Sequence, residues 1–170
     1  MSLQETKPAA GEPTQTTGKG CALSRACAWA PLVLWMGVIF IASTDLMSSA
    51  HTSRFIGPFL HWLKPDISTR AVEVIQMIVR KGGHVTEYTI LALLFWRARR
   101  TTATGQARAW SGREAGITVA FGCFYAMSDE FHQHFVASRE ASVRDVMLDT
   151  LGAAVGAAII WAGDRFRRRG

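Results

Sequence analysis

The sequence predicts an all-α integral membrane protein: a bundle of four transmembrane helices, with a possible interfacial helix in the 45–80 loop. Three observations predict this class. Hydrophobic residues make up 49% of the 170-residue chain and gather in long runs. Charged residues lie mainly at the ends of those runs, and the formal net charge is +6. Because basic residues that flank apolar runs are typical of a membrane protein, and no nucleic-acid motif occurs, we expect no nucleic-acid partner.

The expected organisation is one membrane domain between two tails. Residues 1–24 begin with a stretch rich in Gly, Pro, Thr and Gln, and its lack of apolar periodicity predicts a disordered tail. This stretch has no signal-peptide pattern. Residues 25–166 form the expected membrane domain, and residues 167–170 form a basic C-terminal tail. The three cysteines are irregularly spaced and odd in number, which argues against a disulfide framework.

Four segments qualify as membrane helices, namely residues 27–43, 83–96, 115–127 and 146–163. The strictly apolar parts of the second and third segments are shorter than the roughly 20 residues that a helix needs to cross a bilayer. Polar residues that adjoin these two segments are therefore expected within the depth of the membrane.

Basic residues predict the orientation of the four spans. Five arginines lie between the second and third spans, four lie near the C-terminus, and Lys19 and Arg25 precede the first span. With four spans these regions share one side, which the positive-inside rule identifies as the cytoplasm. Four tryptophans near the same ends are typical of an aromatic belt: Trp29, Trp96, Trp110 and Trp161. We therefore expect a cell-membrane protein with both termini in the cytoplasm.

The loop 45–80 contains two further apolar stretches. HTSRFIGPFLHWLKPD (residues 51–66) is interrupted by Pro58, and TRAVEVIQMIVRK (residues 69–81) has a helical pattern that ends at Gly82-Gly83. This loop is expected to contain a helix that lies on the outer leaflet. A lid that packs over the spans is the alternative.

Ionisable residues gather at the outer end of every predicted span, and such groups are rare in hydrocarbon unless they serve a function. The first span ends at Ser43, Thr44 and Asp45. The expected ligand-binding residues of the other three spans and the last loop are Lys81, His84, Glu87, Tyr88, Ser128, Asp129, Glu130, Gln133, Arg139, Asp145 and Asp149.

The carboxylates of the last span belong to one stripe. Asp145, Asp149, Gly152 and Gly156 are spaced 4, 3 and 4 residues apart, which places them on one face of a helix. Small residues at a GxxxG spacing let neighbouring membrane helices approach closely. The glycines therefore predict that this face, with both carboxylates, points into the bundle.

Several of these residues also have a simpler interpretation. His84 could reach interfacial water, Glu87 could pair with a basic neighbour, and Tyr88 could belong to an aromatic belt. Asp145 could be an N-terminal charge favoured by the helix dipole. Asp149 is harder to explain in this way, because it lies one turn deeper.

The histidines near the end of the third span raise the question of a metal. His132 and His134 lie beside Asp129 and Glu130, but no established ligand spacing stands out. We expect these histidines to face water, and we expect no metal and no cofactor.

Two segments resemble the VanZ-like family. KGGHVTEYTILALL (residues 81–94) resembles the K-x-x-H-x-x-E-Y-x-x-L pattern of that family. SDEFHQHFVASREASVRDVMLDTLGAAVG (residues 128–156) resembles its second pattern, filled here by Ser128, Asp129, Glu130, Gln133, Phe135, Arg139, Asp145, Asp149, Gly152 and Gly156. The resemblance extends over residues 30–162. It departs at residues 136–138, where relatives often have Pro or Gly.

The resemblance implies a small multi-span bacterial membrane protein. The founding member of the family is associated with resistance to teicoplanin, a glycopeptide that resembles vancomycin but carries a fatty-acyl tail. The preferred function is therefore an envelope protein that binds an amphiphile, with membrane lipid and a lipid-linked envelope precursor or an acylated glycopeptide as partners. A polar headgroup would meet Lys81, His84, Arg139 and the carboxylates of the same end.

Two other functions remain open. A membrane-embedded hydrolase or transferase would act on a lipid-linked substrate, with His84, Asp129, Glu130 and Asp149 as candidate acids and bases. No nucleophile-elbow or phosphate-loop motif supports this enzyme. Proton-coupled transport would need a polar relay through the cytoplasmic halves of the spans, which the sequence does not provide. The sequence leaves the ligand, catalysis and the oligomeric state open.

Overall fold

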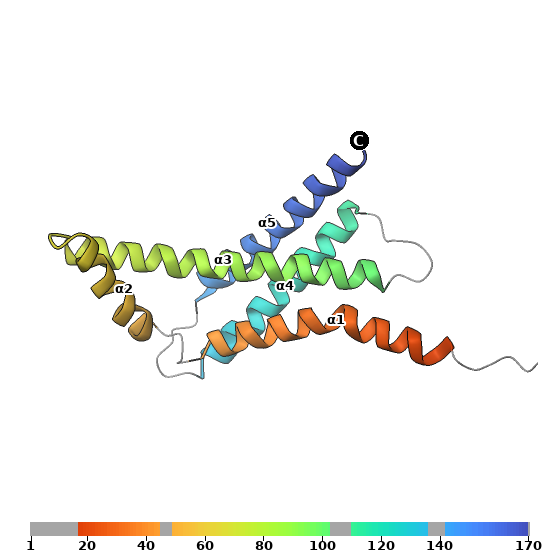
Figure 1. Cartoon of the computed structure of the whole chain (residues 1–170), viewed down its shortest axis with the longest axis horizontal. Coiled ribbons are helices and arrows are strands. Elements are labelled where there is room, and N and C mark those ends of the chain that lie inside the picture. Colours follow the sequence, from red (N-terminus) through yellow and green to blue (C-terminus); the bar gives the residue numbers. More distant parts are fainter. Residues whose placement is uncertain (1–16, 45–48, 103–109, 136–141, 170) are drawn as a thin grey trace, which may run out of the picture.

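A computed structural model of the chain describes residues 17–44, 49–102, 110–135 and 142–169. For residues 17–24 and 49–55 it describes the backbone alone. Within these ranges the chain forms five α-helices and no strand, which confirms the all-α prediction. The helices are α1 (Thr17–Ala42), α2 (Ser49–Leu63), α3 (Thr69–Thr101), α4 (Gly112–Gln133) and α5 (Val143–Arg167) (Figure 1).

Three serines define where the later helices begin. Ser68, Ser111 and Ser142 have extended backbones at the N-caps of α3, α4 and α5. The side chain of each serine accepts a hydrogen bond from a backbone N–H in the first turn of its helix. Such a cap satisfies one of the donors that a helix start leaves without a partner.

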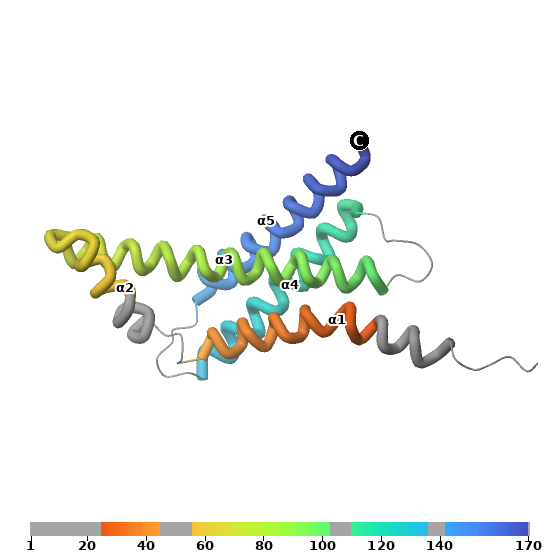
Figure 2. Tube along the Cα trace, in the orientation of Figure 1, coloured from red at the N-terminus to blue at the C-terminus, as the bar shows by residue number. Residues whose placement is uncertain are grey.

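The helices α1, α3, α4 and α5 run in alternating directions, as the tube in Figure 2 shows. Helix α3 packs along α5 and α1, and α5 also packs along α4. The C-terminal ends of α1 and α4 therefore lie at the same end of the bundle as the start of α5 (Figure 2). Among the described residues, helix α2 packs mainly against α3.

Glycines allow α5 to lie directly on α3. A Cβ atom placed on Gly152 would be 2.6 Å from the carbonyl oxygen of Val85, and one on Gly156 would be 2.7 Å from the Cβ atom of Ala92. Both distances are too short for real contacts, so the two backbones touch because these side chains are absent. The close helix contact predicted from the GxxxG pattern is therefore present.

Polarity is distributed in an unusual way over this bundle. Eight polar or charged side chains are buried in the described residues: Ser43, Glu114, Thr118, Asp129, Glu130, Gln133, Asp145 and Asp149. Large apolar side chains are exposed along α1, α4 and α5, including Leu34, Phe124 and Met147, each about 70% exposed. Soluble proteins rarely expose continuous apolar surface of this kind, whereas polar residues that face the interior are typical of membrane bundles.

Two helices are long and apolar enough to cross a membrane by length and composition, namely residues Arg25–Ala42 of α1 and Val143–Arg167 of α5. The expected second and third spans lie inside α3 and α4, whose ionisable residues lower their mean hydropathy. All four expected spans therefore lie in helices, and the helices of the first and fourth are long and apolar enough to cross a membrane.

The loop 45–80 differs from the expectation of one interfacial helix. Residues 69–81 are the first turns of α3, which runs without a break through Gly82-Gly83, and α2 is a separate helix. A glycine costs a helix only about 1 kcal/mol relative to alanine. Contacts of Lys81 and His84 with α5 lie on either side of this pair and hold it in the helix.

The boundaries of the expected domain also shift slightly. Helix α1 begins at Thr17, within the segment expected to be a tail, whereas residues 1–16 lie outside the described part of the chain. Helix α5 ends at Arg167, close to the expected end of the membrane domain.

Candidate functional site

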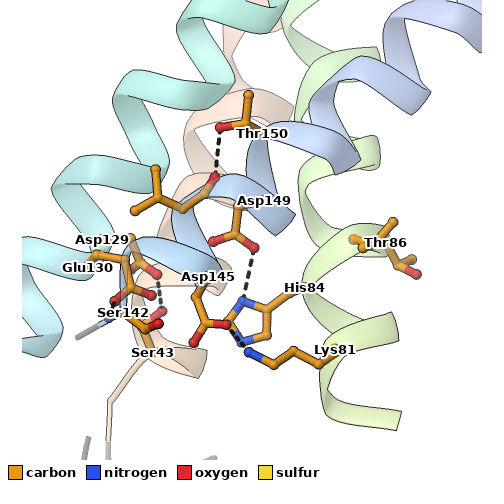
Figure 3. Close-up of polar contacts among 12 residues, drawn as sticks. Ser43, Lys81, His84, Thr86, Asp129, Glu130, Ser142, Asp145, Asp149 and Thr150 are labelled. Atoms are coloured by element: carbon orange, nitrogen blue, oxygen red, sulfur yellow. Dashed lines mark hydrogen bonds and ion pairs between the residues drawn. The ribbon is translucent and has the colours of Figure 1, made fainter. Parts of the chain in front are cut away.

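Four helices bring polar side chains together at one end of the bundle (Figure 3). We call this group the polar cluster. It consists of Ser43 after α1, Lys81, His84 and Tyr88 of α3, Asp129, Glu130 and Gln133 of α4, and Asp145 and Asp149 of α5.

Two pairs connect α3 with α5. The Lys81 ammonium forms an ion pair with Asp145 Oδ1, and His84 Nδ1 lies 3.1 Å from Asp149 Oδ1. Lys81 and His84 are one turn apart on α3, and Asp145 and Asp149 are one turn apart on α5, so the two pairs stack one turn apart. Lys81 and His84 point toward α5 in Figure 3. The Lys81 side chain is 39% exposed, the His84 side chain 12% and that of Asp149 not at all. The cluster thus runs from the surface into the bundle.

Asp129 connects α4 with the end of α1. The Ser43 hydroxyl donates a hydrogen bond of 2.7 Å to Asp129 Oδ2, and the Gln133 amide donates one of 3.0 Å to the same oxygen. The Asp129 side chain is buried. Two donors on one oxygen hold this carboxylate in a fixed orientation.

Glu130 connects α4 with the start of α5. The backbone N–H of Ser142 donates a hydrogen bond of 2.8 Å to Glu130 Oε2. Because Ser142 is the N-cap of α5, this bond fixes the first turn of α5, which carries Asp145, against the end of α4.

Several buried atoms of the cluster have no hydrogen-bond partner within the described residues. They are the hydroxyl of Tyr88 and one carboxylate oxygen each of Asp129, Glu130 and Asp149. Tyr88 is fully buried one turn beyond His84, within electrostatic reach of Asp149 and Asp129. Leaving a buried polar group without a partner costs about 1–3 kcal/mol, so these four atoms make the polar cluster a candidate binding site.

The balance of charge shows what such a site can bind. Four carboxylic acids, those of Asp129, Glu130, Asp145 and Asp149, face one lysine and one histidine in the polar cluster. The lysine is already paired with Asp145. The remaining oxygens are acceptors, so the cluster suits a group rich in N–H and O–H donors better than a bare anion.

An apolar groove begins at the polar cluster. It has a volume of about 520 Å³ and lies between the end of α4 and the start of α5. We call it the α4–α5 groove, and it is lined by Met127, Glu130, Phe131, His134, Ser142, Val143 and Val146. Glu130 belongs to both the groove and the cluster, so a molecule in the groove lies next to the buried acids.

Three residues expected in the site, Ser128, Glu87 and Arg139, make none of the hydrogen bonds or ion pairs that define the cluster among the described residues. Ser128 is exposed, and its hydroxyl donates to the carbonyl of Tyr125 in its own helix. Glu87 is half-buried, its backbone carbonyl accepts a hydrogen bond of 3.0 Å from the Trp35 indole, and its charge lies within electrostatic reach of Tyr88. Arg139 lies outside the described residues. Among the described residues, no three His, Cys, Asp or Glu side chains are arranged to hold a metal ion.

The sequence did not predict two contacts in the site, that of Ser43 with Asp129 and that of Ser142 with Glu130. Ser43 lies in the segment IASTD, at the level where the first span becomes polar, and this position was the available signal. Ser142 precedes Asp145 by three residues, which is the sequence pattern of a helix N-cap followed by an acidic first turn.

A buried ion pair at the opposite end of the bundle was also missed. The Arg99 guanidinium lies 3.1 Å from Glu114, and Glu114 is buried. The sequence SGRE at residues 111–114 predicts a helix start with Glu114 in its first turn. The partner on α3 is a feature of the tertiary structure alone.

These features define a class, an all-helical protein with an apolar exterior and acids buried among its helices. A family model described as VanZ/LLP1 matches residues 28–164, and the chain belongs to this family. The match includes the whole polar cluster and agrees with the resemblance seen in the two sequence motifs. Family membership and the two apolar helices point to a membrane protein. No curated protein and no solved structure matches the chain.

Proposed function

We propose that this protein is a multi-pass membrane protein that binds an amphiphile from the outer side of the cell membrane. The polar cluster receives the headgroup, and the α4–α5 groove receives an acyl chain. The observation that carries this proposal is the set of four buried polar atoms that have no partner among the described residues and lie beside an apolar groove.

The alternating helices support the multi-pass topology. Helices α1 and α5 are apolar enough to span a membrane, and α3 and α4 pack directly between and along them. The arginines at the end of α3, at the start of α4 and at the end of α5 lie opposite to the polar cluster. The positive-inside rule assigns that end to the cytoplasm. In this orientation both termini are cytoplasmic and the polar cluster is near the outer surface.

The chemistry of the cluster narrows the headgroup. Carboxylate oxygens accept hydrogen bonds, so amine, amide and hydroxyl groups are their natural partners. An acylated glycopeptide and the sugar or peptide part of a lipid-linked cell-wall precursor carry such donor groups. The pair of the partly exposed Lys81 and the buried Asp145 lies at the entrance, where either member can exchange its partner for the ligand.

Photocrosslinking tests this binding directly. A photoreactive teicoplanin-type lipoglycopeptide and a lipid-linked cell-wall precursor are offered to membranes that contain the full chain. We expect labelling that falls strongly for Asp149→Asn and His84→Ala, and for Val146→Trp, which fills the α4–α5 groove. Ser128→Ala is the matched control, because Ser128 is exposed and bonded only to its own helix. Equal labelling of all these variants would refute the proposal.

A second measurement links binding to resistance. We expect expression of the chain in a susceptible host to raise the inhibitory concentration of teicoplanin and to leave that of vancomycin, which lacks the acyl tail, nearly unchanged. An equal rise for both glycopeptides would show that the acyl chain is not recognised.

One contact favours a membrane-embedded hydrolase or transferase as a second candidate function. The 3.1 Å contact between His84 Nδ1 and Asp149 orients the imidazole and leaves Nε2 for proton exchange, as in histidines that act as acids or bases. This enzyme would turn over a lipid-linked ester or phosphate in detergent, and Asp149→Asn would abolish the turnover. Binding without any turnover by purified protein would exclude it.

A further inference from the structure

We propose a second binding site, for an anionic phospholipid, in a groove between the start of α4 and the last turns of α5. This basic groove has a volume of about 580 Å³ and is lined by Trp110, Ser111, Gly112, Ala115, Ala157, Ala158, Trp161, Asp164, Arg165 and Arg168. It lies at the end of the bundle opposite to the polar cluster, so it is distinct from the amphiphile site proposed above.

The floor of the basic groove is apolar and closely packed. Trp110 is only 8% exposed and packs edge-to-face on Trp96 of α3, with ring centroids 4.8 Å apart. Ala157 packs into the same cluster, and the small side chains of Ala115 and Ala158 leave room above it. Such a floor complements hydrocarbon and the glycerol region of a lipid, and it offers little to a free polar solute.

The rim of the basic groove is positively charged. The Arg165 guanidinium lies over the Trp161 ring, 5.6 Å from its centroid. Arg168 donates one hydrogen bond of 2.8 Å from Nε to Asp164, and its remaining guanidinium donors stay available to a ligand. Two arginines therefore face one aspartate, and a phosphate diester fits the excess of charge.

The surrounding charges strengthen this attraction. Glu114, the acidic residue nearest to the start of α4, is paired with Arg99 and contributes little repulsion. The basic groove also borders the N-terminus of α4, which begins at Gly112, and the dipole of a helix favours a negative group at this end. Anion attraction thus comes from α4 and from α5, on both sides of the basic groove.

The position of the basic groove identifies the ligand as a lipid. Trp161, which lines it, is about half exposed, and Ile159 and Phe166 in the same last turns of α5 are about half to three-quarters exposed, as side chains in contact with acyl chains would be. Basic pockets between helices on the cytoplasmic side are known places for anionic headgroups, and tryptophan prefers this level of the bilayer. The choice of a lipid rests on the part of the proposed function that places this end of the bundle at the cytoplasmic side of the membrane. It does not depend on any ligand at the polar cluster.

Native mass spectrometry of the full chain in detergent tests the site, with phosphatidylglycerol and phosphatidylcholine as the two probes. We expect a clear preference for phosphatidylglycerol. Arg165→Gln with Arg168→Gln should weaken its binding at least about fivefold, because each basic contact contributes to anionic-lipid affinity. Arg167→Gln with Arg169→Gln is the matched control, since it removes the same charge from residues that do not line the groove. No lipid preference, or equal losses for both double variants, would overturn the proposal.

Two further arms distinguish a lipid site from a site for small phosphate esters and from a general effect of surface charge. Ala158→Trp fills the basic groove without changing any charge, and it should also weaken phosphatidylglycerol binding. Unchanged binding by this variant would show that the groove is not the site. Glycerophosphoglycerol, the headgroup without acyl chains, should not compete. Competition by this headgroup would instead identify a site for small phosphate esters and would refute the lipid assignment.

The same experiment keeps the two proposals apart. His84→Ala should retain phosphatidylglycerol binding, because His84 lies at the opposite end of the bundle. Loss of lipid preference with intact photolabelling at the polar cluster would refute this inference alone. Intact lipid preference without photolabelling would refute the proposed function alone.

Discussion

The contact between α3 and α5 at Gly152 makes a quantitative prediction for Gly152→Ala. The new Cβ atom would lie 2.6 Å from the Val85 carbonyl oxygen and 3.1 Å from Tyr88 Cβ, whereas ordinary contacts begin at 3.4 Å. The two backbones must therefore separate by about 0.8 Å at this point, the difference between 3.4 Å and 2.6 Å. Neither backbone can move out of the way like a flexible side chain, because both belong to long helices.

The expected cost follows from the same geometry. Overpacking a well-packed interior typically costs about 1–3 kcal/mol, and we expect Gly152→Ala to fall in this range. Alanine also has a better helix propensity than glycine, by about 1 kcal/mol, and this offsets part of the loss. The Thr89 hydroxyl, which donates to the Gly152 carbonyl at 2.9 Å, would lose this bond as the helices separate.

Thermal unfolding in detergent measures the effect, with Gly163→Ala as the matched control. Gly163 belongs to the same helix, but a Cβ atom there meets nothing within 4 Å. We expect Gly163→Ala to raise the unfolding temperature slightly and Gly152→Ala to lower it. Because the His84–Asp149 contact is one turn away, Gly152→Ala should also reduce photolabelling. Equal shifts for both variants would refute the view that α5 lies directly on α3.

Three further substitutions test the polar contacts of the bundle. Asp149→Asn should leave the fold intact but weaken the contact with its histidine partner, so photolabelling should fall while thermal stability changes little. A large loss of stability with normal labelling would contradict this. Ser43→Ala removes one of two donors from a buried carboxylate and should cost about 1–3 kcal/mol in unfolding free energy, whereas Ser128→Ala should stay within about 0.5 kcal/mol. Similar values for the two serines would show that the buried hydrogen bond contributes nothing. Glu114→Gln breaks the ion pair with Arg99 and should cost about 1–3 kcal/mol without affecting photolabelling. Altered labelling would mean that the two ends of the bundle are coupled.

The buried acids of the cluster have two roles that these variants can separate. One oxygen each of Asp129 and Glu130 holds neighbouring helices together, through Ser43 and Ser142. The second oxygen of each lacks a partner in the described part of the chain. Structural and ligand-binding functions therefore belong to different atoms of the same carboxylate, and an Asp or Glu variant in α4 should affect both stability and labelling.

The sequence by itself determined which side chains share a helix face. The 3.6-residue period places Asp145, Asp149, Gly152 and Gly156 on one stripe, whatever packs against it. The structure has all four residues of this stripe buried. The all-α class and the gathering of polar residues at one end follow in the same way, because they depend only on local helix geometry and on the order of apolar and polar residues.

Only the tertiary structure decided which residues become partners. Lys81 meets Asp145 and His84 meets Asp149 because α5 lies directly on α3, at a distance that the missing side chain of Gly152 allows. Helix geometry alone turns Ser128 and Asp129 to different sides of α4, by about 100°. Which of the two sides is covered was decided by the packing of α4 against its neighbours, and Asp129 is buried there while Ser128 is exposed. Contacts between helices depend on distances across the bundle, and no local pattern in the chain contains them.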